Sequence, residues 1–154
     1  MKKETFIIAE LSANHNGDIK VAIETIRAAK RAGADAIKLQ TYTADTLTID
    51  CKNDYFKINH GTAWDGEYLY DLYNRAYTPW DWHSELFRVA NEEGIICFSS
   101  PFDNSAVDLL EELKTPIYKI ASFEIQDIPL ISYAASKMKP MILSTGIAEV
   151  SDIE

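Results

Sequence analysis

Two lysines are the strongest chemical signal in the sequence, because each interrupts a short run of apolar residues. Lys38 and Lys119 both lie in runs of strand length. A buried ammonium group without a partner is unfavourable, so each lysine needs a carboxylate or a bound anion. Structural ion pairs are one explanation, with Glu10 beside Lys38 and Glu124 beside Lys119. Anion binding is the other.

Small polar side chains near these lysines favour the second explanation. Ser100, Ser122 and Ser144 each come at or just after the end of an apolar run. Lysines, hydroxyls and backbone amides together make a cradle for a phosphate or carboxylate group. Gln40 joins this set, because the period of two in a strand puts it on the same face as Lys38. The collective pattern predicts an anion-binding site.

Other kinds of chemical site are not indicated. Glycine-rich phosphate-binding loops of the forms GxxxxGK[ST] and GxGxxG are absent from the sequence. Cys51 and Cys97 lack metal-ligand spacing, and His83 is interpreted as a packing residue inside a helix. His15 follows the first apolar run and is either functional or simply solvated. Neither a nucleophilic triad nor a metal site is predicted from these residues.

The elements that must position these residues alternate between two kinds of segment. Short runs of continuous apolar character predict parallel strands buried on both faces, and amphipathic segments between them predict helices. Strand–helix–strand units with right-handed crossovers are therefore expected. The expected strands cover residues 6–11, 36–40, 95–99, 117–121 and 141–144. The expected helices cover residues 19–32, 79–93, 105–114 and 128–139, capped by Asp18, Thr78, Asn104 and Asp127.

Residues 41–77 form a connection that is too long for an ordinary loop. The segment is rich in Tyr, Trp, Asp and Gly, and residues 67–75 predict a short helix within it. It is either a packed aromatic cover over the rim of the sheet or a loop that contacts substrate.

The number and spacing of the strands predict the fold class. Five α/β units in a parallel sheet fit the first five of a (β/α)8 TIM barrel, which typically needs about 250 residues. Residues 151–154 match a Ser-x-x-Glu capping box, which opens a helix that the sequence does not continue. We therefore expect residues 1–154 to be a truncated N-terminal portion of a barrel domain. A complete five-stranded doubly wound domain is the alternative.

Composition excludes several classes of protein. The formal net charge of −9 argues against nucleic acid as a partner. No apolar run approaches the roughly 18 residues of a membrane span. Glu10 interrupts the first apolar run before it could act as an export signal. We expect a cytoplasmic protein with reduced cysteines and no membrane partner.

Five stretches, in order along nearly the whole chain, carry recognisable motifs. They are residues 7–17 (IIAELSANHNG), 33–41 (GADAIKLQT), 99–103 (SSPFD), 118–124 (YKIASFE) and 143–146 (LSTG). Together they resemble the sialic acid synthase family. Within that family, residues 64–66, 69–73 and 76–83 look most like pseudaminic acid synthases.

The resemblance implies a condensation of phosphoenolpyruvate with an open-chain N-acetylated amino-sugar aldehyde, which forms a nonulosonic acid and releases phosphate. It assigns phosphoenolpyruvate binding to Lys38, Lys119, Ser100 and Ser122. It assigns contact with the sugar or the reacting centre to Gln40, Phe102 and Glu124. Glu10 would orient a lysine or assist proton transfer.

The resemblance also implies parts that this sequence lacks. The divalent metal of the family, Mn or Mg, is held by histidines on later strands. A C-terminal antifreeze-like domain reaches over a partner's active site in the expected homodimer. We therefore expect the 154-residue chain alone to be inactive.

Two alternatives remain open at this point. The first is another barrel that uses phosphoenolpyruvate or a phosphosugar, such as a deoxy-sugar-acid synthase or an aldolase with a Schiff base on Lys38 or Lys119. The second is an inactive half-barrel that works only by association with another chain.

Overall fold

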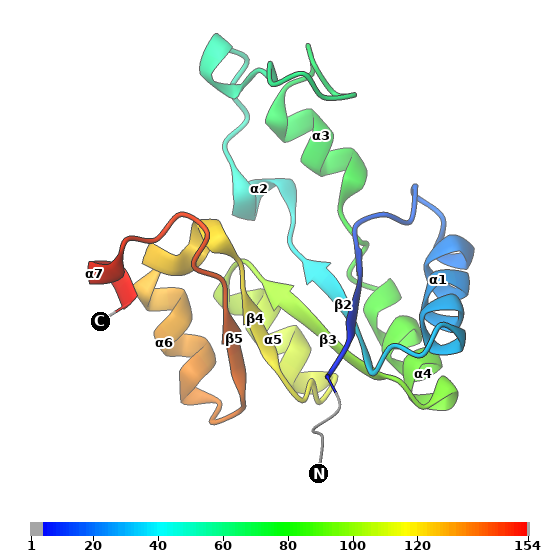
Figure 1. Ribbon diagram of the computed structural model, residues 1–154. Coiled ribbons are helices and arrows are strands. Elements are labelled where there is room, and N and C mark those ends of the chain that lie inside the picture. The colour runs from blue at the N-terminus through cyan, green and yellow to red at the C-terminus, as the bar shows by residue number, and fades with distance from the viewer. Residues whose placement is uncertain (1–4, 154) are drawn as a thin grey trace.

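The apolar runs form one parallel sheet in which every strand pairs with the next along the chain (Figure 1). The computed structural model describes residues 5–153. The order of the strands across the sheet never reverses, whereas the strand order of a doubly wound sheet reverses at its switch point. The doubly wound alternative is therefore wrong. The strands are β1 (Ile8–Ser12), β2 (Ala36–Thr41), β3 (Ile96–Pro101), β4 (Tyr118–Ile120) and β5 (Met141–Leu143).

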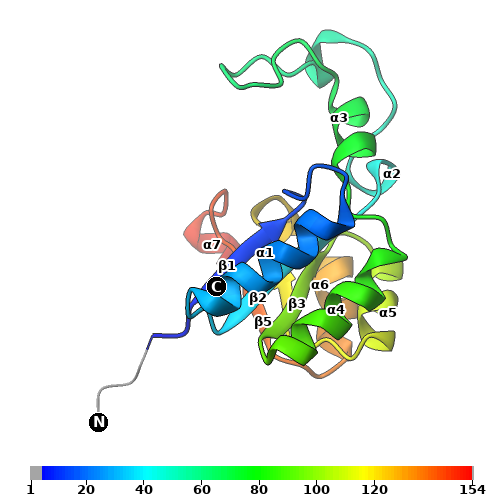
Figure 2. The same ribbon diagram turned by 90° about the vertical axis from the view of Figure 1, so that its right-hand side faces the viewer.

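Helices cover one face of this sheet, in the arc seen in Figure 2. One core cluster packs Ile37 and Leu39 of β2 against α1 and α4, and a second packs Tyr118 of β4 against α5 and α6. Because side chains alternate along a strand, residues of the other parity, including Lys38 and Lys119, face away from the helices. The helices are α1 (Ile19–Arg31), α4 (Trp82–Glu93), α5 (Asn104–Glu112) and α6 (Ile128–Ser136).

The helix caps agree with the sequence in part. Asp18 accepts a hydrogen bond from the Lys20 N–H at 2.8 Å, and Asp127 caps α6, both as predicted. The cap of α5 is Asp103 instead of Asn104, because the Asp103 carboxylate accepts from the Ala106 N–H at 2.9 Å. Each cap satisfies a backbone donor that the first helical turn leaves free.

The long connection projects beyond the carboxyl ends of the strands (Figures 1 and 2). It contains α2 (Ala44–Leu47), the 3₁₀ helix η1 (Asp54–Phe56) and α3 (Leu69–Ala76). The predicted helix over residues 67–75 corresponds to α3, and α2 and η1 were not predicted. We call residues 42–77 the excursion.

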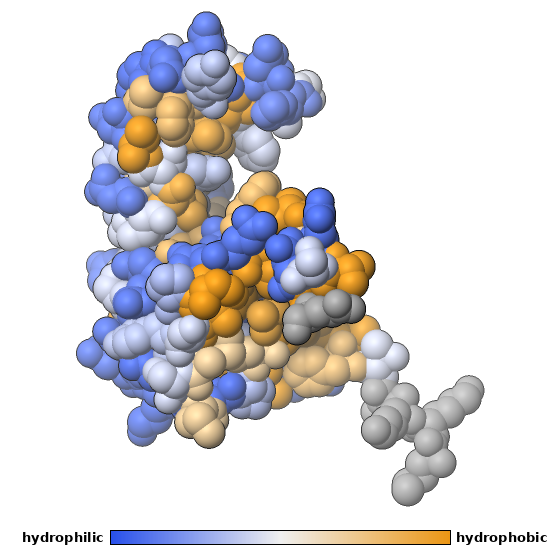
Figure 3. All heavy atoms as spheres, turned by 90° about the vertical axis from the view of Figure 1, so that its left-hand side faces the viewer, coloured by the Kyte–Doolittle hydropathy of each residue, from blue (hydrophilic) through white to orange (hydrophobic). Residues whose placement is uncertain are grey.

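The last described segment contains α7 (Val150–Ile153), which begins one residue before the predicted cap at Ser151. Its first turn is closed by the Glu149 N–H, which donates to Asp152 Oδ2 at 2.8 Å. Glu154 lies outside the described residues. Figure 3 shows apolar side chains gathered around this end of the chain, where Leu143, Ile147, Val150 and Ile153 are exposed. No helix in residues 5–153 combines the length and apolar character needed to cross a membrane.

Candidate active site

Lys38 and Glu10 lie opposite each other on neighbouring strands β2 and β1. The Lys38 Nζ atom is 3.6 Å from Glu10 Oε2, and the side chains are 8% and 62% exposed respectively. Burial lowers the pKa of Lys38, and the Glu10 carboxylate opposes this shift. The ion pair anticipated from the sequence is therefore present, but its carboxylate remains largely in solvent.

Lys119 on β4 has a different set of partners. Its Nζ atom donates to Ser144 Oγ at 2.5 Å and to the Ile120 carbonyl at 2.9 Å. Burial lowers the pKa of Lys119, and the positive charge of Lys38 lowers it further, while the Glu10 and Glu124 carboxylates act in the opposite direction. Within residues 5–153 Lys119 forms no salt bridge, so the structural pair with Glu124 is not made. Only one of the two ammonium groups, that of Lys38, has a carboxylate partner within residues 5–153, and the excess positive charge favours a bound anion.

Glu124 lies just after β4, in the 3₁₀ helix η2 (Ser122–Gln126). Its Oε2 atom is buried and has no hydrogen-bond partner among the described residues. Burial raises the pKa of Glu124, with a further rise from Asp127, while Lys119 acts in the opposite direction. A buried carboxylate oxygen without a partner is unfavourable, and groups of this kind concentrate at functional sites.

The two predicted serines lie at the ends of different strands. Ser100 is 1% exposed and pairs in register with Gln40 of β2. Ser122 opens η2, and its Oγ atom lies only 3.0 Å from the position that a Cβ atom on Gly146 would occupy. The segment after β5 therefore approaches Ser122 closely, next to the Ser144 hydroxyl that binds Lys119.

This close approach gives a testable prediction for Gly146→Ala. The added methyl group would displace the Ser122 hydroxyl, because 3.0 Å is below an ordinary carbon–oxygen contact. We expect the dissociation constant of an anionic ligand such as inorganic phosphate to rise by about tenfold, the loss typical of one hydrogen bond to a charged group. Calorimetry would measure it, with the thermal midpoint as a control. An unchanged dissociation constant would show that Ser122 does not contact the anion.

Phe102 and Gln40 occupy separate positions. The Phe102 ring packs edge-on against Tyr42 at 5.7 Å between centroids, and Tyr42 packs in the same way against Tyr73 of the excursion at 6.0 Å. Phe102 therefore supports the base of the excursion. Gln40 instead lines a cavity.

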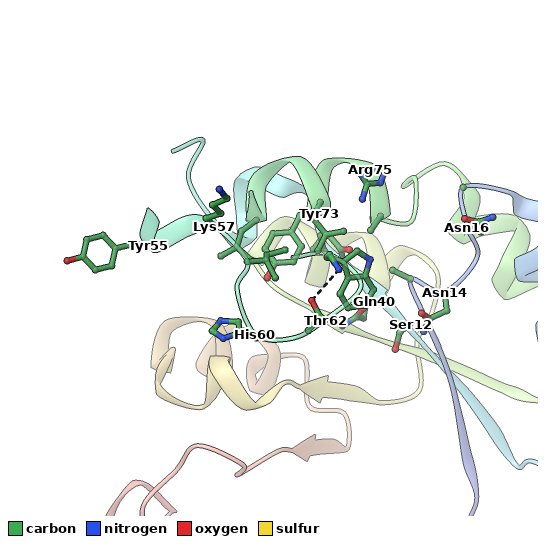
Figure 4. Close-up of a pocket in the computed structure, with 18 residues that line it drawn as sticks. Ser12, Asn14, Asn16, Gln40, Tyr55, Lys57, His60, Thr62, Tyr73 and Arg75 are labelled. Carbon is green, nitrogen blue, oxygen red and sulfur yellow. Dashed lines mark hydrogen bonds between the residues drawn. The ribbon is translucent and has the colours of Figure 1, made fainter. Parts of the chain in front are cut away.

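The cavity has a volume of about 810 Å³ and was not predicted (Figure 4). Three segments line it: the loop after β1, the end of β2 and the excursion. Ser12, Asn14 and Gln40 contribute polar groups, and Tyr73 and Trp64 contribute aromatic rings. The excursion thus walls a cavity beyond the strand ends, and its contact with a substrate stays a prediction. Lys38, Lys119, Ser100 and Ser122 are not among the lining residues, so the cavity adjoins the lysine cluster without containing it.

The buried histidines have structural partners. His83 is fully buried and bonds to Thr41 Oγ1 at 2.9 Å and to the Pro79 carbonyl, which confirms it as a packing residue. His15 is 1% exposed, so its interpretation as a solvated residue is wrong. Thr78 does not cap α4, because the N-cap of that helix is Asp81. The Thr78 hydroxyl instead bonds to His15 Nε2 at 3.1 Å.

These features define an α/β protein of barrel type, with an anion-binding cluster and a polar cavity at the carboxyl ends of its strands. The chain belongs to the NeuB family, whose family model matches residues 25–154. The resemblance to sialic acid synthases is thereby confirmed.

Individual relatives agree with this assignment. Pseudaminic acid synthase from Helicobacter pylori is 53% identical over 148 residues, covering 96% of this chain and 43% of the relative. Human N-acetylneuraminate-9-phosphate synthase is 32% identical over 158 residues, covering 97% of this chain and 41% of the relative. The chain therefore spans less than half the length of these relatives.

Solved structures confirm the fold. N-acetylneuraminic acid synthetase from Leptospira borgpetersenii superposes with a TM-score of 0.83 at 31% identity, over 98% of this chain and 48% of that one. A truncated 3-deoxy-D-arabino-heptulosonate 7-phosphate synthase from Thermotoga maritima gives a TM-score of 0.64 at 14% identity, a likeness of fold alone. The expected succession of five β/α units of a barrel is thus confirmed.

Proposed function

We propose that the protein takes part in condensing phosphoenolpyruvate with an N-acetylated amino-sugar aldehyde, giving a nonulosonic acid and phosphate. The observation that carries this proposal is the pair of lysines, Lys38 and Lys119, which repel each other while, among residues 5–153, only Lys38 has a carboxylate partner. A substrate with a phosphate and a carboxylate group supplies the missing negative charge. The 53% identity with a pseudaminic acid synthase supports the pseudaminic branch.

The lysines and serines would hold phosphoenolpyruvate. Lys38 on β2 and Lys119 on β4 lie on the same face of the sheet, with β3 between the two strands. Ser100 and Ser122 would supply hydroxyl donors. As the C–O bond of the substrate breaks, negative charge develops on the departing phosphate. Fixed cations and donors stabilise that charge without reorganising, and many enzymes owe most of their rate acceleration to stabilisation of this kind.

The carboxylates would serve proton transfer, and the cavity would bind the sugar aldehyde. Glu124 has a buried, unpartnered Oε2 atom and a raised pKa, which suit a group that moves a proton. Glu10, 3.6 Å from Lys38, would orient that lysine or assist proton transfer. Gln40 would contact the sugar in the cavity that it lines, and Phe102 would support that contact through Tyr42.

A divalent metal, Mn or Mg, is also part of the proposal, together with a homodimer in the cytoplasm. In the described part of the chain, no three His, Cys, Asp or Glu residues lie together as a metal-ligand group. The described residues therefore supply no complete metal site. The ligands would be supplied from outside this chain, and the chain alone is accordingly expected to be inactive.

An aldolase is the second candidate, because the lowered pKa of Lys119 also suits an amine that forms a Schiff base. Borohydride reduction in the presence of a carbonyl substrate separates the two. A stable adduct on Lys119 or Lys38 would support the aldolase, and its absence would count against it.

The test of the proposed function is phosphate release by the complete gene product. Phosphoenolpyruvate and Mn²⁺ would be supplied with each candidate amino sugar in turn. Release only with an altro-configured diacetamido sugar would support the pseudaminic branch, and release with N-acetylmannosamine would keep the family and reject that branch. Silence with every sugar would reject the proposal.

A further inference from the structure

The cavity is built from two walls that lie far apart in the sequence. Residues 12–17, the last residue of β1 and the loop after it, supply the hydroxyl of Ser12 and the amides of Asn14 and Asn16 (Figure 4). The opposite wall belongs to α3 and includes Leu72 and Tyr73. The spacing of these walls decides what fits between them, because ligand pockets bury most of a small molecule's surface.

One buried hydrogen bond joins the two segments. His15 Nε2 lies 3.1 Å from Thr78 Oγ1, and both residues are 1% exposed. Thr78 follows α3 by two residues, so it fixes the point at which the excursion returns to the sheet. The Trp82 ring packs edge-on against the imidazole at 5.3 Å between centroids, which restricts the orientation of the imidazole ring.

The other ring nitrogen shapes the first wall. His15 Nδ1 accepts a hydrogen bond from the Gly17 N–H at 3.1 Å, which leaves Nε2 as the protonated nitrogen that donates to Thr78. Ser12 and Asn16 adopt left-handed backbone conformations, with φ of 53° and 51°. Such conformations are unfavourable for residues with a Cβ atom and persist only where surrounding contacts impose them.

We propose that His15 is a positioning residue, which acts through Thr78 to set the distance between the two walls and thereby the affinity for the sugar aldehyde. This inference rests on the proposed function. His15 does not line the cavity, so it acts without touching the substrate. The polar wall would meet the hydroxyl and acetamido groups, and the aromatic wall would meet the apolar face of the sugar.

A purely structural bond would behave differently, and Thr115 supplies the matched control. Thr115 is also fully buried, and its Oγ1 atom donates to the Ile117 carbonyl at 2.9 Å. It precedes β4 and therefore lies at the amino end of the strands, away from the cavity. Thr78→Val and Thr115→Val each remove one buried hydroxyl bond while keeping the shape of the side chain. His15→Gln, which retains a donor, tests for rescue.

The first measurement is hydrogen exchange in the complete gene product without substrate. We expect Thr78→Val to accelerate exchange in residues 12–17, while Thr115→Val leaves that loop unchanged. Equal exchange in the two variants would overturn the inference, whether or not the protein proves to be a synthase.

The second measurement is steady-state phosphate release. Thr78→Val is expected to raise the KM for the sugar about tenfold, with the KM for phosphoenolpyruvate unchanged, as for a lost hydrogen bond. Thr115→Val should lower the thermal midpoint only, and His15→Gln should remain closer to the unsubstituted protein than His15→Ala. Equal sugar KM values in the two threonine variants would contradict the inference. Failure of the proposed function is distinct, because the unsubstituted protein would then release no phosphate.

Discussion

Replacing Lys119 by methionine is expected to lower kcat/KM for phosphoenolpyruvate by about 10²–10³-fold in the complete gene product, the loss typical of one donor to developing negative charge. Lys119 has hydroxyl and carbonyl partners but no carboxylate among the described residues. Its charge is therefore available to the substrate. Methionine retains the length and apolar stem of lysine while removing that charge. Coupled-enzyme detection of phosphate would measure the effect.

The matched control for this experiment is Lys139→Met. The Lys139 Nζ atom lies 2.6 Å from Glu111 Oε1, and its side chain is 25% exposed. It interacts with the helix-covered side of the sheet, where Glu111 and Tyr118 lie. We expect Lys139→Met to change thermal stability but to keep kcat/KM within about threefold, as for a substitution without contact to the reacting groups. Similar losses in both lysine variants would contradict the assignment of Lys119.

The second large effect is expected for Glu124→Gln. Glutamine keeps the shape of the side chain but cannot exchange the proton, so kcat should fall by about 10²–10⁴-fold, the usual contribution of a general acid or base. The dissociation constant of phosphoenolpyruvate should change little, because Lys38 and Lys119 remain. Calorimetry and pre-steady-state kinetics would separate binding from turnover.

The pH profile gives an independent check on Glu124. Burial raises the pKa of this carboxyl group. If the ionised form accepts a proton, activity rises with pH through this raised pKa, and the acid limb lies above that of an ordinary glutamate. Glu124→Gln should abolish this limb, while Glu112→Gln, at an exposed position, should leave it in place. An acid limb that persists in Glu124→Gln would assign it to another group.

The features that were predictable from the sequence depend on short-range patterns. Continuous apolar runs predicted all five strands, and the period of two correctly put Lys38 and Gln40 on one face. Asp18 and Asp127 were recognisable as caps because a cap lies within three residues of the N–H that it binds. Strand order followed from the regular alternation of strands and helices, which favours a barrel.

The features that were missed depend on long-range contacts. The bond between His15 and Thr78 joins residues 63 positions apart, and nothing local to either residue indicates it. Thr78-Pro79 was misinterpreted as a helix start because the partner of the Thr78 hydroxyl, His15, lies far away in the sequence. The packing of Phe102 against Tyr42 and the cavity both arise from the way the excursion returns across the strand ends. No repeating pattern in the sequence specifies that path.

A crystal structure of the complete gene product with bound phosphoenolpyruvate would test the central claim most directly. We predict that oxygens of the phosphate and carboxylate groups lie within hydrogen-bonding distance of both Lys38 Nζ and Lys119 Nζ, with Ser122 Oγ as a further donor. Phosphoenolpyruvate bound elsewhere, with both lysines contacting only protein atoms, would contradict the account.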